Sequence, residues 1–165
     1  MFPFVLIFLA FAADRLSKLW AAEFLAQNGA TQIHPLLTIV PTYNRGIAFG
    51  MFQGIGPIVG WLSLLVVVAL GIYLIRLPKH MWILRIGVAL IIGGALGNLV
   101  DRVIMGRVLD FIQTSLRPGV FNVADVMIYL GVIISLGGLV LQRSEPKTGQ
   151  QRLEIEEGSA DLPLK

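Results

Sequence analysis

The sequence contains no cysteine, so the chain can form no disulfide, bind no metal through a thiolate and use no cysteine nucleophile. Charge is also scarce, because only 14% of the 165 residues are charged and 56% are hydrophobic. Soluble domains carry about 25% charged and roughly 45–50% apolar residues. The net charge is only +3 and no Lys/Arg-rich block is present, so we expect no nucleic-acid partner. The composition is typical of a membrane protein of one domain.

Long apolar runs dominate what remains. A membrane-crossing helix needs about 20 mostly apolar residues. Four windows qualify: Phe2–Leu25, Pro57–Ile75, Ile83–Val100 and Val123–Leu141. They predict an all-α membrane protein with four transmembrane helices, one domain over residues 1–142 and a polar tail over 143–165.

The first window could instead be a cleaved signal peptide, since "AFAAD" resembles a cleavage site. No Lys or Arg precedes the apolar run, however, and apolar residues continue past Lys18. This pattern favours a retained helix.

The short loop between the second and third windows carries Arg76, Lys79 and Arg85 and no acid, which predicts a cytoplasmic loop and cytoplasmic termini. Residues 27–56 and 106–121 would then face outward. In the first of these segments, β-branched and aromatic residues broken by Pro35, Pro41 and Gly46 predict short strands and turns. In the second, Pro118-Gly119 predicts a turn.

Ionisable residues within apolar windows are candidates for function. Asp14 and Lys18 share a helix face, either as an ion pair near the outer interface, with Lys18 extending toward water, or as part of a site. Asn98, Asp101 and Arg102 also share one face, because they stand at relative positions 0, 3 and 4. A local Asp101–Arg102 pair at a packed helix end would explain two of these residues but not Asn98.

The same helix carries Gly93 and Gly97, four residues apart, with Gly94 between them. Small residues at this spacing allow another helix to approach closely. We therefore expect a neighbouring helix to pack against this stretch.

Two further carboxylates lie near the predicted outer edge of the membrane. Asp110 is flanked by apolar residues in "VLDFI", and Asp125 begins the fourth window, where it could complete a capping box with Asn122. Two carboxylates in one site of low dielectric share a single proton near neutrality, an arrangement suited to peptide hydrolysis. The only histidines, His34 and His80, are predicted on opposite sides, so a histidine-based metal site or triad is not expected.

Three blocks, "YNRGIAFG", "GGALGNLVDRVIMGRVLDFI" and "FNVADVMIYLG", resemble the signature motifs of bacterial lipoprotein signal peptidase, or signal peptidase II. The resemblance covers about residues 14–131. It implies a multi-pass aspartic endopeptidase of the bacterial inner membrane, with its active site near the outer leaflet. Such an enzyme removes the signal peptide from diacylglyceryl-modified prolipoproteins, just before the lipid-modified cysteine.

The resemblance assigns catalysis to Asp110 and Asp125, and it implies a β-rich extracytoplasmic cradle between the first and second helices. Residues that bind substrate or support the site would be Asp14, Asn44, Gly46, Asn98, Asp101, Arg102 and Asn122. No metal or cofactor is implied, and we expect a monomer in the lipid bilayer. The sequence departs from the family at Arg15, where glutamine is common.

Two other functions remain open. A proton-coupled transporter or channel would have acids spread across the depth of the membrane. A non-enzymatic assembly subunit would tolerate Asp110→Asn and Asp125→Asn.

Overall fold

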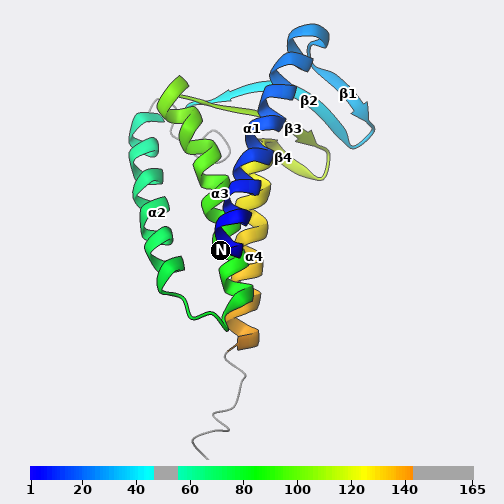
Figure 1. Ribbon diagram of the computed structural model, residues 1–165. Helices are drawn as coiled ribbons and strands as arrows, with labels where there is room; N and C mark the ends of the chain where they lie inside the picture. Colours follow the sequence, from blue (N-terminus) through cyan, green and yellow to red (C-terminus); the bar gives the residue numbers. More distant parts are fainter. Residues whose placement is uncertain (47–55, 143–165) are drawn as a thin grey trace, which may run out of the picture.

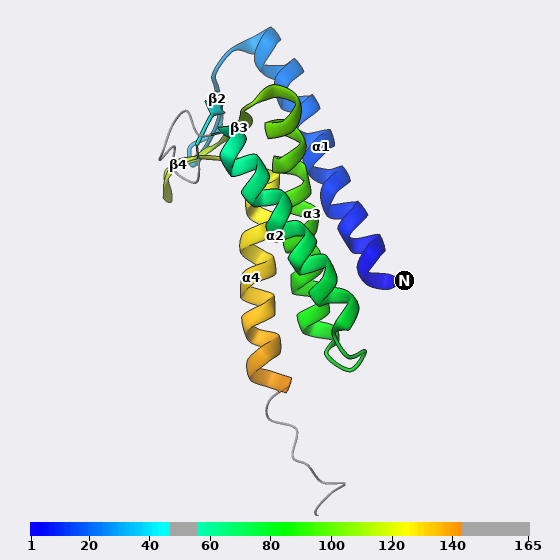
Figure 2. The same cartoon turned by 90° about the vertical axis from the view of Figure 1, so that its left-hand side faces the viewer.

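The computed structural model describes residues 1–46 and 56–142 (Figure 1). The predicted tail, 143–165, and residues 47–55 of the first outward segment lie outside the described residues. The elements in order are α1 (Phe2–Asn28), β1 (Thr31–His34), β2 (Leu37–Asn44), α2 (Gly56–Arg76), α3 (Trp82–Met105), β3 (Val108–Thr114), β4 (Arg117–Phe121) and α4 (Val123–Gln142). Figures 1 and 2 show the strands at one end of the helices and the α2–α3 connection at the other.

Helix α3 is the centre of the bundle and packs against α1, α2 and α4. Its apolar span is 56% buried, against 17% for those of α2 and α4. Glycine allows this closeness, because a Cβ on Gly93 would lie 2.6 Å from Cβ of Ala10 in α1. On another face, a Cβ on Gly94 would lie 2.5 Å from the carbonyl oxygen of Ala124 in α4. The predicted close approach is confirmed, and it serves two neighbouring helices.

Within residues 1–46 and 56–142, three helical spans are long and apolar enough to cross a membrane: Ile58–Arg76, Trp82–Met105 and Val123–Leu141. They correspond to the second, third and fourth predicted windows. Helix α1 contains the first window, but Asp14, Arg15 and Lys18 interrupt its apolar stretch. The count of four spans therefore stays a prediction. Helix α1 packs against α3, and its retention, like the fourth span, stays a prediction.

One antiparallel sheet in the order β1-β2-β3-β4 lies at the end of the bundle. Strands β1 and β2 confirm the prediction for the first outward segment. The sheet takes its other two strands from residues 106–121, so it is not confined to the connection between the first two helices. The described part of the molecule is therefore mostly helical with a small antiparallel sheet, which agrees with a helical protein that carries a small β-rich cradle. The extracytoplasmic position of that cradle stays a prediction.

The predicted turn at Pro118-Gly119 is wrong by a short distance along the chain. Residues 115–116 form the turn, and Pro118 and Gly119 lie inside β4. Thr114 pairs with Arg117, but Gln113 pairs with Val120, so the register shifts across the Pro-Gly pair. Gly119 has φ 85°, and proline has no N–H to donate, so this pair makes an irregularity within the strand instead of its end.

Gly106 ends α3 and directs the chain into β3. Its φ of 66° is in the left-handed region, and its N–H donates to the carbonyl of Arg102 at 3.0 Å. Alternate residues of β3 then face opposite sides. Leu109 and Phe111 pack in an apolar cluster against the end of α1, whereas Val108 and Asp110 line a cavity. This alternation turns the Asp110 carboxylate away from the apolar cluster.

Candidate active site

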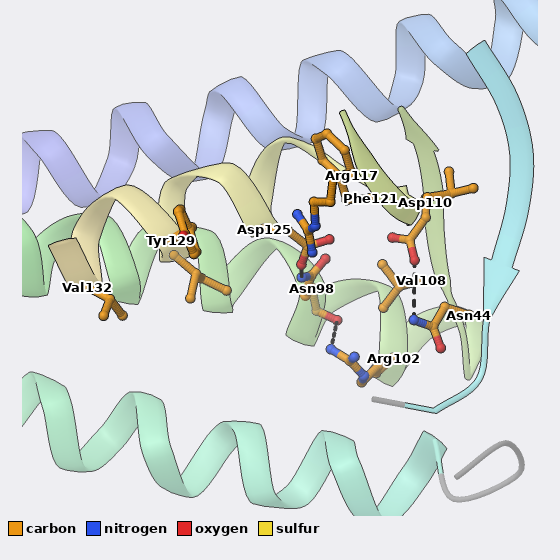
Figure 3. A pocket seen from close by; sticks show the side chains of 12 residues that line it. Asn44, Asn98, Arg102, Val108, Asp110, Arg117, Phe121, Asp125, Tyr129 and Val132 are labelled. Atoms are coloured by element: carbon orange, nitrogen blue, oxygen red, sulfur yellow. Dashed lines mark hydrogen bonds between the residues drawn. The ribbon is translucent and has the colours of Figure 1, made fainter. Parts of the chain in front are cut away.

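A cavity of about 260 Å³ lies where α3, α4 and the sheet meet (Figure 3). Five of the nine predicted site residues line it: Asn44, Asn98, Arg102, Asp110 and Asp125. The remaining lining residues are Val108, Arg117, Val120, Phe121, Ile128, Tyr129 and Val132. The cavity thus has a polar end at the two carboxylates and an apolar wall along α4.

Asp125 belongs to the first turn of α4 and has two roles there. Its N–H donates to Oδ1 of Asn122 at 3.0 Å, and the N–H of Asn122 donates to Oδ2 of Asp125 at 3.2 Å. The predicted capping box is therefore confirmed. The other carboxylate oxygen, Oδ1, accepts from Nδ2 of Asn98 at 3.0 Å and belongs to the cavity. Capping and a place in the site are compatible, because they use different oxygens.

Asp110 is only 4% exposed. Its Oδ1 accepts from Nδ2 of Asn122 at 2.6 Å. Its Oδ2 accepts from Nδ2 of Asn44 at 3.3 Å, and Figure 3 shows this second bond. Burial, followed by the negative charge of Asp125, raises the pKa of Asp110 to about 6. The hydrogen bonds from the two asparagines and the charge of Lys18 act in the opposite direction. Asp110 is therefore the carboxyl group that retains a proton more readily than a solvated aspartate.

Two amides join the carboxylates. Nδ2 of Asn122, a fully buried side chain, donates to Asp110 and also to Oδ1 of Asn98 at 3.1 Å. Asn98 in turn donates to Asp125. The path Asp110–Asn122–Asn98–Asp125 connects β3, the start of α4 and α3. It brings both predicted carboxylates into one hydrogen-bonded group at one cavity.

A cluster of four charged residues lies beneath this group, between α1 and α3. Nζ of Lys18 is 2.9 Å from Oδ2 of Asp14 and 2.7 Å from Oδ2 of Asp101, and Arg15 also pairs with Asp101. Lys18 is 4% exposed, so the interpretation that it extends toward water is wrong. Among the described residues, the ion pairs of Asp101 run to Arg15 and Lys18 in α1, so the alternative of a local pair with Arg102 is not supported.

Asp14 has a second contact that ties the cluster to the site. Its Oδ1 accepts from the backbone N–H of Ala124, next to Asp125, at 3.0 Å. This oxygen thereby satisfies one of the free N–H groups at the start of α4. The acid in α1 helps to hold the helix end that carries Asp125.

Arg102 extends from α3 between the cavity and the chain after β2. It donates from Nη1 to the carbonyl of Asn98 at 3.4 Å and from Nη2 to the carbonyl of Gly46 at 3.3 Å. Gly46 is held again by its own N–H, which donates to Oδ1 of Asn44 at 2.9 Å. Arg102 also lines a second, mainly apolar cavity of about 530 Å³ between α2 and α3. It therefore lies at the border between a polar and an apolar space.

The sequence model of the family described as Signal peptidase (SPase) II matches residues 6–141. The chain belongs to the signal peptidase II family. Membership indicates a peptidase, and the three apolar helices fit a multi-pass protein of the bacterial inner membrane. The resemblance in the three sequence blocks is confirmed.

Relatives and solved structures agree with this assignment. The lipoprotein signal peptidase of Anaplasma marginale (strain Florida) is 40% identical over 140 residues, which are 80% of each chain. That of Dichelobacter nodosus (strain VCS1703A) is 40% identical over 141 residues, covering 81% of this chain and 90% of the relative. A bacterial membrane enzyme solved by the in meso method at 2.3 Å resolution superimposes with a TM-score of 0.76 at 25% identity, covering 88% of this chain and 91% of that one.

All nine predicted site residues of this family member belong to the cavity or to its hydrogen-bonded surroundings. Sequence reasoning missed the place of Lys18, which contacts Asp14, Asp101 and Asn98 at once. Its i,i+4 spacing from Asp14 was visible in the sequence. The contacts of Lys18 with α3 could not be seen in the sequence, because they join residues about 80 positions apart.

Proposed function

We propose that the chain is an aspartic endopeptidase that removes the signal peptide from diacylglyceryl-modified prolipoproteins, cutting just before the lipid-modified cysteine. The observation that carries the proposal is the pairing of Asp110 and Asp125 on one cavity, joined through Asn122 and Asn98. Family membership supports the substrate class. The two carboxylates supply the chemistry.

The different surroundings of the two acids suggest their roles. Asp110 is almost fully buried and its pKa is raised to about 6, so below that pH it holds the shared proton. Asp125 is half-buried, so it is the acid to which we assign the attack by water. Paired acids in unlike environments divide the work of acid and base in this way.

In the first step, Asp125 takes a proton from water while the water oxygen attacks the scissile carbonyl carbon. Asp110 gives its proton to the carbonyl oxygen, so that a neutral tetrahedral intermediate forms. In the second step, Asp125 gives its proton to the amide nitrogen and the C–N bond breaks. The intermediate returns a proton to Asp110 as the new carboxylic acid forms, and the cysteine leaves with a free amino group.

The charge distribution supports an orientation with the sheet outside. Within the described residues, the end at the α2–α3 connection has Arg76, Lys79 and Arg85 and no acid. Basic residues in short loops favour the cytoplasm. With α1 as a fourth span, both termini are then cytoplasmic and the catalytic cavity lies near the outer leaflet. A diacylglyceryl group anchored in that leaflet would bring the scissile bond to the two aspartates.

The same network weighs against a proton-coupled transporter. Such a protein needs titratable groups at successive depths. Here a few groups connect all four acids, Asp14, Asp101, Asp110 and Asp125. These groups are the side chains of Lys18, Asn98 and Asn122 and a backbone N–H at the start of α4. Two acids at one cavity, with the other two held in ion pairs between α1 and α3, fit hydrolysis better than a relay.

The purified protein in lipid nanodiscs should cleave a diacylglyceryl-modified precursor and leave the same precursor without lipid uncut. Mass spectrometry should find the new amino terminus at the modified cysteine. A chelator should leave the rate unchanged, because the proposed chemistry needs only the two carboxylates. Loss of activity in chelator with recovery on adding a metal would contradict the aspartic mechanism, and equal cleavage of both precursors would contradict the substrate class.

The rate should fall as pH rises through about 6, where Asp110 loses the proton that it must donate. A profile of kcat/KM from about pH 4.5 to about pH 8.5 reports the ionisations of the free enzyme. The hydrogen bond from Asn44 lowers the pKa of Asp110, so Asn44→Ala should move the alkaline limb to higher pH. Asn28→Ala, at the exposed end of α1, is the matched control and should leave the limb in place. An Asn44→Ala limb at lower pH would show that Asp110 is not the acid.

A further inference from the structure

We propose that Lys18 is a positioning residue of the catalytic group: it holds the Asn98 amide against Asp125 and balances the charge beneath the two aspartates. This inference deepens the proposed function and rests on it. No sequence motif pointed to this role for Lys18.

The ammonium group of Lys18 has three donors and no acceptor. Each donor has one partner at short distance: Oδ2 of Asp101 at 2.7 Å, Oδ2 of Asp14 at 2.9 Å and Oδ1 of Asn98 at 2.9 Å. The side chain is 4% exposed and its partners are between 0% and 6% exposed. All three N–H donors of Lys18 are therefore satisfied by groups within the protein.

The contact with Asn98 is the one that reaches the site. An amide side chain has one oxygen that accepts and one NH₂ group that donates. Oδ1 of Asn98 accepts from Lys18 and from Asn122, so Nδ2 is left to face Asp125 at 3.0 Å. Without Lys18, the oxygen loses one of its two donors and the amide loses its fixed point on α1. Asp125 would then be free to turn away from the geometry needed to activate water.

The charge of Lys18 also acts on the site, in addition to its hydrogen bonds. Asp14 and Asp101 carry two negative charges, and Lys18 and Arg15 carry two positive charges. The balanced cluster adds no net negative charge beneath Asp110 and Asp125. Arg102 of α3 and Arg117 of β4 are further cations that line the cavity of the dyad, and neither is changed in the variants below. Removal of Lys18 leaves one excess negative charge below the site, which makes the shared proton harder to remove.

A purely structural role is the alternative, because the Lys18 ion pairs also join α1 to α3. The two roles differ in what they change. A structural lysine would alter the melting temperature and the folded fraction, while each folded molecule kept its turnover and pH profile. A positioning lysine changes kcat and the pH profile of the folded enzyme.

The test compares Lys18→Met, Lys18→Arg and the double variant Asp14→Asn/Lys18→Met in nanodiscs, with rates normalised to folded protein. Lys18→Met should lower kcat by about a hundredfold, the scale expected when a reacting group is displaced by about 1 Å, with little change in KM. Its alkaline limb should move to higher pH. Lys18→Arg keeps the charge and donors, so its limb should stay near that of the parent enzyme.

If Lys18→Met fails to fold, the double variant still tests the role of Lys18. It removes the Asp14 carboxylate, which would otherwise be buried without its Lys18 partner. The amide oxygen that Asp14→Asn introduces can still accept from the N–H of Ala124. The kcat of the double variant should stay low while its alkaline limb returns toward that of the parent. Arg85→Met, a cation change on α3 at the end near the α2–α3 connection, is the matched control and should affect stability alone.

Unchanged kcat together with an unchanged alkaline limb in Lys18→Met, or unchanged kcat in the double variant, would overturn the positioning role. This result is distinct from a failure of the proposed function. In that case the parent enzyme would not cut the lipid-modified precursor, or the variants of Asp110 and Asp125 would cut it.

Discussion

Asp110→Asn and Asp125→Asn should each stop cleavage of the lipid-modified precursor on its own. A side chain that gives and takes protons in the reaction supplies about a hundredfold to ten-thousandfold in rate. Each aspartate acts in both steps, so we expect kcat to fall by at least about a thousandfold in either variant. A time course of precursor and product with the purified variants measures this loss.

Folding should survive both changes. Asparagine keeps the size of aspartate and one of its acceptor oxygens. In Asp125→Asn, that oxygen can still accept from the backbone N–H of Asn122, so α4 keeps much of its cap. In Asp110→Asn, it can accept from Nδ2 of Asn122. Both variants should therefore express in the membrane and melt in a single transition.

Glu23→Gln is the matched control for these two variants. Glu23 is an exposed acid on α1, and its side chain accepts from Gln27 on the same helix. The same change of acid to amide at this position should leave the rate as it is. If one aspartate variant processed the precursor at a rate close to that of the control, the shared-proton mechanism would be wrong. If both did so, the assembly-subunit hypothesis would be favoured.

The local parts of the architecture could be predicted from the sequence because they depend on neighbouring residues. Apolar runs predicted the spans within α2, α3 and α4 to within a few residues. The capping box at Asn122 and Asp125 and the close approach at Gly93 depend on spacing within one helix end or one face. Each of these features follows from chain geometry over a few residues.

The parts that could not be predicted depend on pairs that are distant in the chain. Strands β2 and β3 pair across more than 60 residues, Thr42 with Asp110 for example, and no local pattern specifies that register. The ion pair between Asp101 and Lys18 is of the same kind. From sequence spacing alone, Arg102 was one alternative for the ion-pair partner of Asp101. The packing of α1 against α3 provided a different one.

The charges of α1 and the glycines of α3 depend on each other. Asp14 and Lys18 are tolerated in a mainly apolar helix because both have polar partners. Lys18 contacts Asp101 and Asn98 in α3, and Asp14 contacts Lys18 and the backbone N–H of Ala124. Gly97 provides the space, since a Cβ there would lie 2.8 Å from Cγ of Asp14. The polar group of the site thus continues through the bundle from β3 to α1. The Asp110 and Asp125 pair is its end that faces the cavity.

Asn122 lies at the centre of that group, and its two functions can be separated by substitution. Its Oδ1 caps α4 by accepting from Asp125, and its Nδ2 joins Asp110 to Asn98. Asn122→Ser keeps a good capping oxygen but has no amide to reach Asp110. Asn122→Ala loses both functions. The loss of the cap should cost about 1 kcal/mol in the free energy of unfolding, in the alanine variant only.

Both variants should lower kcat/KM by about a hundredfold, because both release Asp110 from its 2.6 Å donor. That hydrogen bond lowers the pKa of Asp110, so both should also move the alkaline limb of the profile to higher pH. Thermal unfolding in nanodiscs and kinetics on the lipid-modified precursor measure the two effects separately. A serine variant with full activity would reduce Asn122 to a helix cap, and the two carboxylates would then have to be held together by Asn98 and Asn44 alone.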